Sequence, residues 1–137
     1  MDPLDSELKA LSVLLVVDDD ALARTFLRDQ FEARGHMVLT ARDAEEARTL
    51  LEQVEDPVVV VVLDLMLPGM NGVDLLAELR PRSGAHLRFI LVSASRVVGR
   101  VAQDHPLVVA RLEKPIDIPR LLQHVDDARS QLGMSAA

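Results

Sequence analysis

Residues that could do chemistry follow four short apolar runs of this sequence. They are Asp18, Asp19 and Asp20 after VLLVV, Asp64 after VVVVVL, Ser93 after FILV, and Glu113 and Lys114 after LVVARL. Each has an ordinary explanation when taken alone, because Asp often caps a helix, Ser is a common loop hydroxyl and Lys is usually a solvated charge. Their repetition after similar runs indicates one shared polar site.

The acids of this group suit a hard divalent cation. Two carboxylates about 4 Å apart repel by about 4 kcal/mol at an effective dielectric constant near 20, so something must offset that cost. Mg2+ fits an open site made of a few carboxylates, a carbonyl and waters. We expect Asp18 and Asp19 to be metal ligands, Lys114 to neutralise part of the cluster, and Asp20 to cap the following helix.

A carboxylate beside Mg2+ and a lysine can also attack phosphorus and form an aspartyl phosphate. Asp64 is the best candidate for this nucleophile, because it is the single acid at the end of the most apolar run. The metal and Lys114 would neutralise charge on the transferring group. The Ser93 hydroxyl could then donate a hydrogen bond to the new phosphoryl oxygens.

The apolar runs alternate with segments whose apolar residues recur at helical spacing. The expected strands are 13–17, 36–41, 58–63, 89–92 and 107–112, and the expected helices are 21–35, 43–54, about 73–79, a weaker 95–103, and 118 to about 133. This alternation predicts one doubly wound α/β domain, (βα)5, with a parallel sheet and with the wholly apolar third strand at its centre. Ligands of such sheets bind at the carboxyl ends of the strands, where the candidate residues stand.

The helical segments carry further expectations. Four apolar residues should form the buried face of the first helix: Leu22, Phe26, Leu27 and Phe31. Gly35 should end that helix, and Asp43 should cap the second at its N-terminus. The weak apolar pattern of 95–103 and its internal Gly99 make this helix the candidate moving element.

Four pieces of the sequence resemble the receiver domain of two-component response regulators, the CheY-like superfamily. The pieces are LLVVDDD, VVLDLMLPGMNG, ILVSA and LEKP, in that order. The resemblance covers 11–132, which leaves 1–10 as an N-terminal extension and 133–137 as a tail. It implies the flavodoxin-like strand order 2-1-3-4-5 and either a stand-alone receiver or one cut from a longer protein.

The resemblance also implies a role for each matching residue. Asp64 matches the phosphoacceptor, Asp19 the acid that binds Mg2+ directly, and Asp18 the acid that assists, often through water. Met66 matches the residue whose backbone carbonyl completes the metal site. Lys114 matches the lysine that contacts the phosphoryl group, and the bond from it to Pro115 is expected to be cis.

Two positions bear on switching. Ser93 matches the Ser/Thr hydroxyl that responds to phosphorylation, whereas many receivers carry Tyr or Phe where this chain has Arg111. Arg111 could pair with acids on a partner, or it could be a solvated residue at the edge of the sheet. The resemblance implies a sensor histidine kinase or histidine phosphotransfer protein as phosphoryl donor, and an unnamed downstream protein as target. Such a domain catalyses its own phosphorylation and dephosphorylation but is not a turnover enzyme.

Composition indicates what such a domain can bind and in which compartment it works. The 137 residues carry a formal net charge of −7, which argues against direct nucleic-acid binding. The chain has no cysteine, lacks a signal peptide pattern, and its apolar runs are far shorter than the ~20 residues that span a bilayer. We therefore expect a cytoplasmic protein without membrane insertion.

Three other functions compete with this one. A phosphatase or transferase of the haloacid-dehalogenase type wants a second acid two residues after the nucleophile, where this chain has Met66. A flavin- or nucleotide-binding domain wants a Gly-rich loop after the first strand, and none is present. A receiver-like interaction module that works without phosphorylation stays open because of Arg111.

Overall fold

The computed structural model describes residues 12–53, 58–67, 74, 76–77, 86–96, 100 and 104–131. Its elements in chain order are β1 (Ser12–Val17), α2 (Ala21–Glu32), β2 (Met37–Ala41), α3 (Ala44–Gln53), β3 (Val58–Asp64), β4 (His86–Ser93), β5 (Val108–Glu113) and α5 (Ile118–Gln131). None of the helices in these ranges has the length and apolar character required to cross a membrane.

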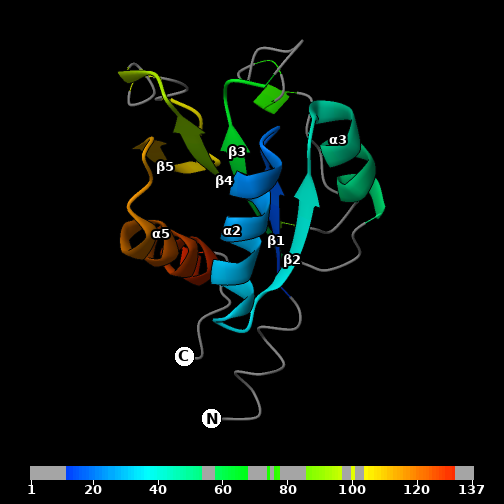
Figure 1. The fold of residues 1–137 in the computed structure, drawn as a ribbon, viewed down its shortest axis with the longest axis vertical. Helices are drawn as coiled ribbons and strands as arrows, with labels where there is room; N and C mark the ends of the chain where they lie inside the picture. The colour runs from blue at the N-terminus through cyan, green and yellow to red at the C-terminus, as the bar shows by residue number, and fades with distance from the viewer. Residues whose placement is uncertain are drawn as a thin grey trace.

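The five strands form one parallel sheet in the order β2-β1-β3-β4-β5, which confirms the predicted fold class and strand order (Figure 1). β3 lies at the centre, and Val60, Val61, Val62 and Leu63 are all buried. A central parallel strand is covered on both faces, which is why its sequence is continuously apolar rather than alternating.

Helices cover both faces of the sheet, so the core has two layers. Leu14 and Val16 of β1 pack with buried residues of α2 and α5 on one face of the sheet. Val13, Leu15 and Val17 of the same strand pack with buried residues of α3 on the other face. This alternation follows from the two-residue period of a strand. The result is a rigid mount whose strand ends hold the polar residues.

The two predicted N-caps are confirmed, whereas α2 ends at Glu32 with Ala33 as its C-cap, before Gly35. Asp20 is the N-cap of α2, and its Oδ1 accepts hydrogen bonds from the backbone N–H groups of Leu22 at 3.0 Å and Ala23 at 3.5 Å. The Asp43 Oδ1 likewise accepts from the Glu46 N–H at 2.8 Å at the start of α3. Gly35 follows α2 with φ of 86°, a left-handed conformation that glycine adopts without steric cost.

The expected buried face of α2 is partly wrong. Leu27 and Phe31 are buried, but Leu22 is 82% exposed and Phe26 is 50% exposed. The apolar stripe near the N-terminal end of α2 extends beyond the sheet that α2 covers. Leu22 and Phe26 therefore lie on the surface beside the strand ends.

All five strands differ from their expected bounds, β1, β2 and β3 by one residue at one end and β4 by most. β4 begins at His86 rather than at residue 89, because His86 to Arg88 pair in register with Val58 to Val60 of β3. β5 runs one residue later than expected, from Val108 to Glu113. The expected helix near 73–79 and the expected helix 95–103, with Gly99, lie mostly outside the described residues.

Candidate functional site

Three carboxylates meet where β1 and β3 end. β1 and β3 are paired neighbours, with Val17 opposite Leu63, so the residues that follow them come out side by side. Asp18, Asp19 and Asp64 each offer a carboxylate oxygen, and these oxygens lie within 4.8 Å of one another. Asp18 and Asp64 are buried, whereas Asp19 is exposed. The predicted acidic cluster is present.

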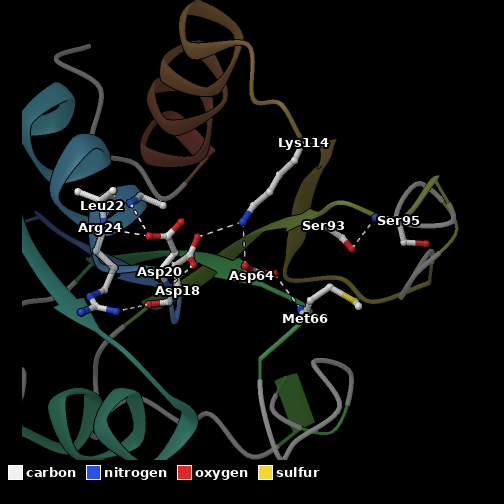
Figure 2. A network of polar contacts seen from close by, with 10 residues as sticks. Asp18, Asp20, Leu22, Arg24, Asp64, Met66, Ser93, Ser95 and Lys114 are labelled. Atoms are coloured by element: carbon white, nitrogen blue, oxygen red, sulfur yellow. Dashed lines mark hydrogen bonds and ion pairs between the residues drawn. The ribbon is translucent and has the colours of Figure 1, made fainter.

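Lys114 completes this cluster from the end of β5. Its Nζ lies 3.2 Å from Asp18 Oδ2 and 2.9 Å from Asp64 Oδ2, so one ammonium group bridges both buried carboxylates (Figure 2). The Lys114 backbone N–H donates to the Ser93 carbonyl at 2.8 Å, which ties the end of β5 to the end of β4. The Lys114–Pro115 peptide bond is cis, as expected. We call Asp18, Asp19, Asp64 and Lys114 the aspartate rim.

Backbone donors hold the second oxygen of each buried carboxylate. Asp18 Oδ1 accepts from the Asp20 N–H at 2.9 Å, and Asp64 Oδ1 accepts from the Met66 N–H at 2.8 Å. Each carboxylate therefore has one oxygen on its own loop and the other on Lys114. This arrangement fixes the plane of both groups before any ligand binds, and it leaves Asp19 as the exposed member.

Burial and charge act in opposite directions on this cluster. Burial raises the pKa of Asp18, a shift that the Asp20 N–H and the Lys114 charge only partly offset and that the Asp64 charge increases. Burial alone would lower the pKa of Lys114, but the hydrogen bond and charge of Asp64, together with Asp18, outweigh it and raise that pKa. Lys114 is thus held in its charged form, while the rim keeps an excess of negative charge.

Arg24 belongs to this site, although the sequence did not single it out. Its Nη1 donates to the Asp18 backbone carbonyl at 2.7 Å from the first turn of α2 (Figure 2). The Asp18 N–H in turn donates to the Ala41 carbonyl at 3.1 Å. The main chain of Asp18 is therefore fixed from α2 and from β2. In the sequence Arg24 is simply an arginine six residues after Asp18, and this spacing alone does not predict a hydrogen bond.

The other predicted residues lie around the rim. Ser93 is buried at the end of β4, and its Oγ accepts from the Ser95 N–H at 3.1 Å (Figure 2). Met66 follows Asp64, and its side chain is 63% exposed. Arg111 lies on the edge strand β5, opposite Leu91, and is half-buried. Pro68 and Gly72, the loop residues of the motif after Asp64, lie outside the described residues.

The rim fits a divalent metal on the chemistry of its donors. All three converging ligands are carboxylate oxygens, which hard cations such as Mg2+ prefer. Lys114 supplies a single positive charge against three carboxylates, so a divalent ion would remove the remaining repulsion. The two buried acids are already oriented by backbone N–H groups, which reduces the reorganisation that binding would require.

A hollow of about 260 Å³ opens directly beside the rim. Asp18 and Lys114 lie in its lining, and its apolar wall is formed by Phe26, Leu27 and Ile116 with neighbouring residues of α2 and the start of α5. We call it the apolar hollow. The exposed Phe26 ring lies at this hollow, so a partner that reaches the rim would meet apolar surface there.

Comparison with known proteins gives a consistent result. A family model described as the response regulator receiver domain matches residues 14–126. The probable transcriptional regulator ycf27 of Guillardia theta is 36% identical over 98 residues, which are 72% of this chain and 37% of that protein. The chain spans about a third of the length of the curated relatives it matches.

Solved structures agree with the fold. A sensor protein from Polaromonas sp. JS666 superposes with a TM-score of 0.75 at 27% identity, covering 88% of this chain and 98% of that one. The response regulator TrrA from Thermotoga maritima, solved in complex with Mg2+-BeF, gives a TM-score of 0.71 at 24% identity, covering 85% of this chain and 98% of that one. At that identity, the similarity to TrrA supports the fold alone.

Proposed function

The chain belongs to the response regulator receiver family, and on this premise we propose that it accepts a phosphoryl group on Asp64 in a Mg2+-dependent reaction. The donor would be a phosphohistidine of a sensor histidine kinase or of a histidine phosphotransfer protein. One observation carries the proposal: Asp64 is buried with its Oδ2 2.9 Å from Lys114 Nζ and with carboxylate oxygens of Asp18 and Asp19 within 4.8 Å.

The metal would be held by Asp18, Asp19 and Asp64, with the backbone carbonyl of Met66 as a fourth protein ligand. Mg2+ would supply charge neutralisation for the phosphoryl oxygens. The acids would keep the orientation that the Asp20 and Met66 N–H groups already give to Asp18 and Asp64. Arg24 would hold the main chain of Asp18 in place while the metal binds.

In the transfer step, a carboxylate oxygen of Asp64 would attack phosphorus in line with the donor's imidazole nitrogen. The new bond is the acyl phosphate O–P bond, and the bond that breaks is the N–P bond, whose electron pair returns to the imidazole. Lys114 would follow the negative charge from the carboxylate to the phosphoryl oxygens, since its ammonium group is already 2.9 Å from Asp64. No other co-reactant is required.

The product would act on β4 and β5 through two residues. The Ser93 hydroxyl would turn from Ser95 toward a phosphoryl oxygen, and Lys114 would turn toward the same group. Because the Lys114 N–H donates to the Ser93 carbonyl, a shift at either strand end is passed to the other. Phosphorylation would thus change the surface formed by the segments after these two strands, which a downstream protein would bind.

The apolar hollow supports a protein donor rather than a small molecule alone. Phe26 is 50% exposed and lines the apolar hollow together with Asp18 and Lys114, and burying exposed apolar area is a major source of protein association free energy. Phe26→Lys should slow phosphoryl transfer from a phosphohistidine protein and leave labelling by acetyl phosphate unchanged. Met37→Lys is the matched control, because Met37 is also 50% exposed but lies on β2 outside the apolar hollow's lining.

The central experiment is labelling with acetyl phosphate and Mg2+, followed by intact-protein mass spectrometry. Wild type should gain one phosphoryl group and Asp64→Asn none, while Asp29→Asn, an exposed acid on α2, should behave as wild type. Binding of beryllofluoride should follow the same pattern. Equal labelling of wild type and Asp64→Asn would end the assignment of the phosphoacceptor.

A receiver-like interaction module that works without phosphorylation is the second candidate. The observation that favours it is Arg111, which stands where many receivers carry an aromatic switch residue. Failure of wild type to take up either acetyl phosphate or beryllofluoride would select this second candidate. Both candidates describe a signalling module rather than a turnover enzyme.

A further inference from the structure

The last turn of α5 carries a buried arginine whose charge is not matched by its surroundings. Arg129 is 9% exposed and is the one arginine among the buried residues that the structure describes. It makes no hydrogen bond and no ion pair with the described residues, and its Nε is buried without an acceptor. A buried charge is strongly destabilising unless an opposite charge and hydrogen bonds compensate it. Arg129 therefore calls for an acidic partner.

The neighbouring acid on α5 does not meet this need. Asp126, one turn earlier, is already paired with Arg34 at 3.6 Å. Burial lowers the pKa of Arg129, and the charge of Asp126 offsets only part of that shift. The helix dipole favours a cation in the last turn, but it gives the buried Nε no hydrogen-bond acceptor. Two guanidinium groups against one carboxylate leave one positive charge uncompensated.

Arg129 lies at the end of the domain where β1 begins. Leu14, the third residue of β1, and Ala128, the residue before Arg129, belong to one buried cluster. α2 returns to the edge of the sheet where β1 and β2 begin, and the end of α5 lies beside the end of α2 (Figure 1). The chain that precedes β1 therefore enters the fold near Arg129.

The N-terminal extension, 1–10, has the charge and the length to reach this arginine. It lies outside the described residues and carries three acids against one lysine. Glu7 is five residues before Ser12, and an extended segment of that length spans about 17 Å, enough to cross from the sheet to the helix layer that covers it. The tail 133–137 contains no acidic side chain. Of these two segments, only the extension can offer side-chain carboxylates.

We propose that an acidic side chain of the N-terminal extension, Asp5 or Glu7, pairs with Arg129 and docks the extension against the end of α5. The planar guanidinium group matches the geometry of a carboxylate. Docking would compensate the buried charge and fasten the chain before β1 at the end of the domain opposite the aspartate rim. It is independent of phosphorylation of Asp64, because none of these residues belongs to the rim. A solvent anion and an acid of a second copy of the chain are the alternative partners.

Cleavage of the full chain by a lysine-specific protease measures this docking directly. The chain has two lysines, and Lys114 precedes Pro115, where such proteases do not cut, so cleavage after Lys9 reports on the extension alone. Arg129→Met should be cut about tenfold faster than wild type, and added NaCl should speed the cleavage of wild type. Arg120→Met, which removes an exposed arginine from the first turn of α5, is the matched control and should be cut as wild type.

Melting temperatures of metal-free protein test the same contact from the side of the acids. The double variant Asp5→Asn, Glu7→Gln should melt about 4 °C below the control Asp29→Asn, Glu52→Gln, which removes two exposed acids of α2 and α3. In the Arg129→Met background the two double variants should melt together. The acid variants leave the core intact, so they keep the test valid if Arg129→Met proves unstable.

Equal cleavage of wild type and Arg129→Met would overturn the proposal, and so would equal melting temperatures of the two double variants in the wild-type background. Inorganic phosphate that stabilises wild type but not Arg129→Met, together with equal cleavage, would assign the arginine to a solvent anion instead. A wild-type dimer that Arg129→Met dissociates in sedimentation would assign it to a second copy of the chain.

Discussion

The aspartate rim differs in its charges from a second hollow of about 340 Å³, whose lining includes Arg96, Arg111 and Arg120 and which we call the arginine hollow. In the rim, Asp18 and Asp64 are buried, each is held by a backbone N–H, and both contact one ammonium group. In the hollow, Arg96 and Arg120 are exposed and make no ion pair within the part of the chain that the structure describes. Both regions border the end of β5, so buried, paired charges and exposed charges lie next to the same strand end.

The charged groups of the rim are held in fixed positions, whereas the exposed arginines of the hollow can change their partners. A buried charge interacts strongly with its neighbours and is costly to leave unpaired, so its position is fixed by the groups around it. An exposed charge is screened by water and salt and contributes little to stability, so it can change partners easily. We therefore expect substitutions in the rim to affect stability, metal response and pH dependence, and substitutions of the exposed arginines in the hollow to leave all three nearly unchanged.

The largest difference in stability between the two regions should come from Lys114→Met compared with Arg120→Met. Without Lys114, Asp18 and Asp64 lose the cation that contacts both of them. Removing one partner of a buried ion pair costs about 3–5 kcal/mol, and because the Lys114 side chain is 31% exposed we expect a loss of about 1–3 kcal/mol. Arg120→Met should change the free energy of unfolding by no more than about 0.5 kcal/mol.

Urea unfolding of metal-free protein at neutral pH measures both values. Lys114→Arg is the control that keeps a cation at the end of β5, and it should recover part of the loss. If Lys114→Met and Arg120→Met unfold at the same urea concentration, the rim is no more tightly coupled than the hollow and the comparison fails.

The sequence could predict the sheet and the cluster of acids for the same reason. Continuous apolar runs such as 58–63 occur where a parallel strand is covered on both faces, and the residues after such strands must emerge at one edge. Asp18, Asp19, Asp64 and Lys114 were found in this way, because strand ends are visible as the points where apolar runs stop.

The remaining features depend on which surfaces the fold covers and on which distant residues it brings together. Helical periodicity marked Leu22 and Phe26 as apolar but does not say how far the sheet reaches under α2. The Arg24 contact with the Asp18 carbonyl requires a particular side-chain conformation. The arginine hollow joins three segments between residues 96 and 120, and no local pattern links them.

An intermediate effect is expected at Asp19, the exposed acid of the rim. Asp19→Asn removes one of three repelling carboxylates, so the melting temperature of metal-free protein should rise by a few degrees. The same change removes a proposed metal ligand, so the further rise on adding Mg2+ should be lost. Wild type should gain about 2.7 kcal/mol when free Mg2+ reaches about 100 times its Kd.

Asp20→Asn is the matched control for this prediction. Asp20 is the next residue, is exposed and carries the same charge, but it caps α2 and lies outside the cluster. Asn is also a good N-cap, so this variant should keep both its stability and its response to Mg2+. An Asp19→Asn protein that responds to Mg2+ as wild type does would remove Asp19 from the ligand set.

The smallest expected effect is a pH dependence that belongs to the rim and not to the hollow. Burial raises the pKa of Asp18 above its ordinary value of 3.8, so the native state binds this proton more tightly than the unfolded state does. Stability falls with rising pH wherever the native state holds more protons. The contribution of Asp18 is therefore most favourable below pH 3.8 and is lost as pH rises through the raised pKa.

Urea unfolding of metal-free wild type and Asp18→Asn from about pH 3.5 upward tests this. The free energy of unfolding of wild type minus that of the variant should decrease with pH and then level off. Taking the difference removes the titration of acids common to both proteins, and Arg120→Met treated in the same way should give a flat difference because an arginine stays protonated throughout. A difference for Asp18 that rises with pH would mean that Lys114 and the Asp20 N–H outweigh burial. The rim would then be electrostatically satisfied without a metal, and its contrast with the arginine hollow would lie in exposure alone.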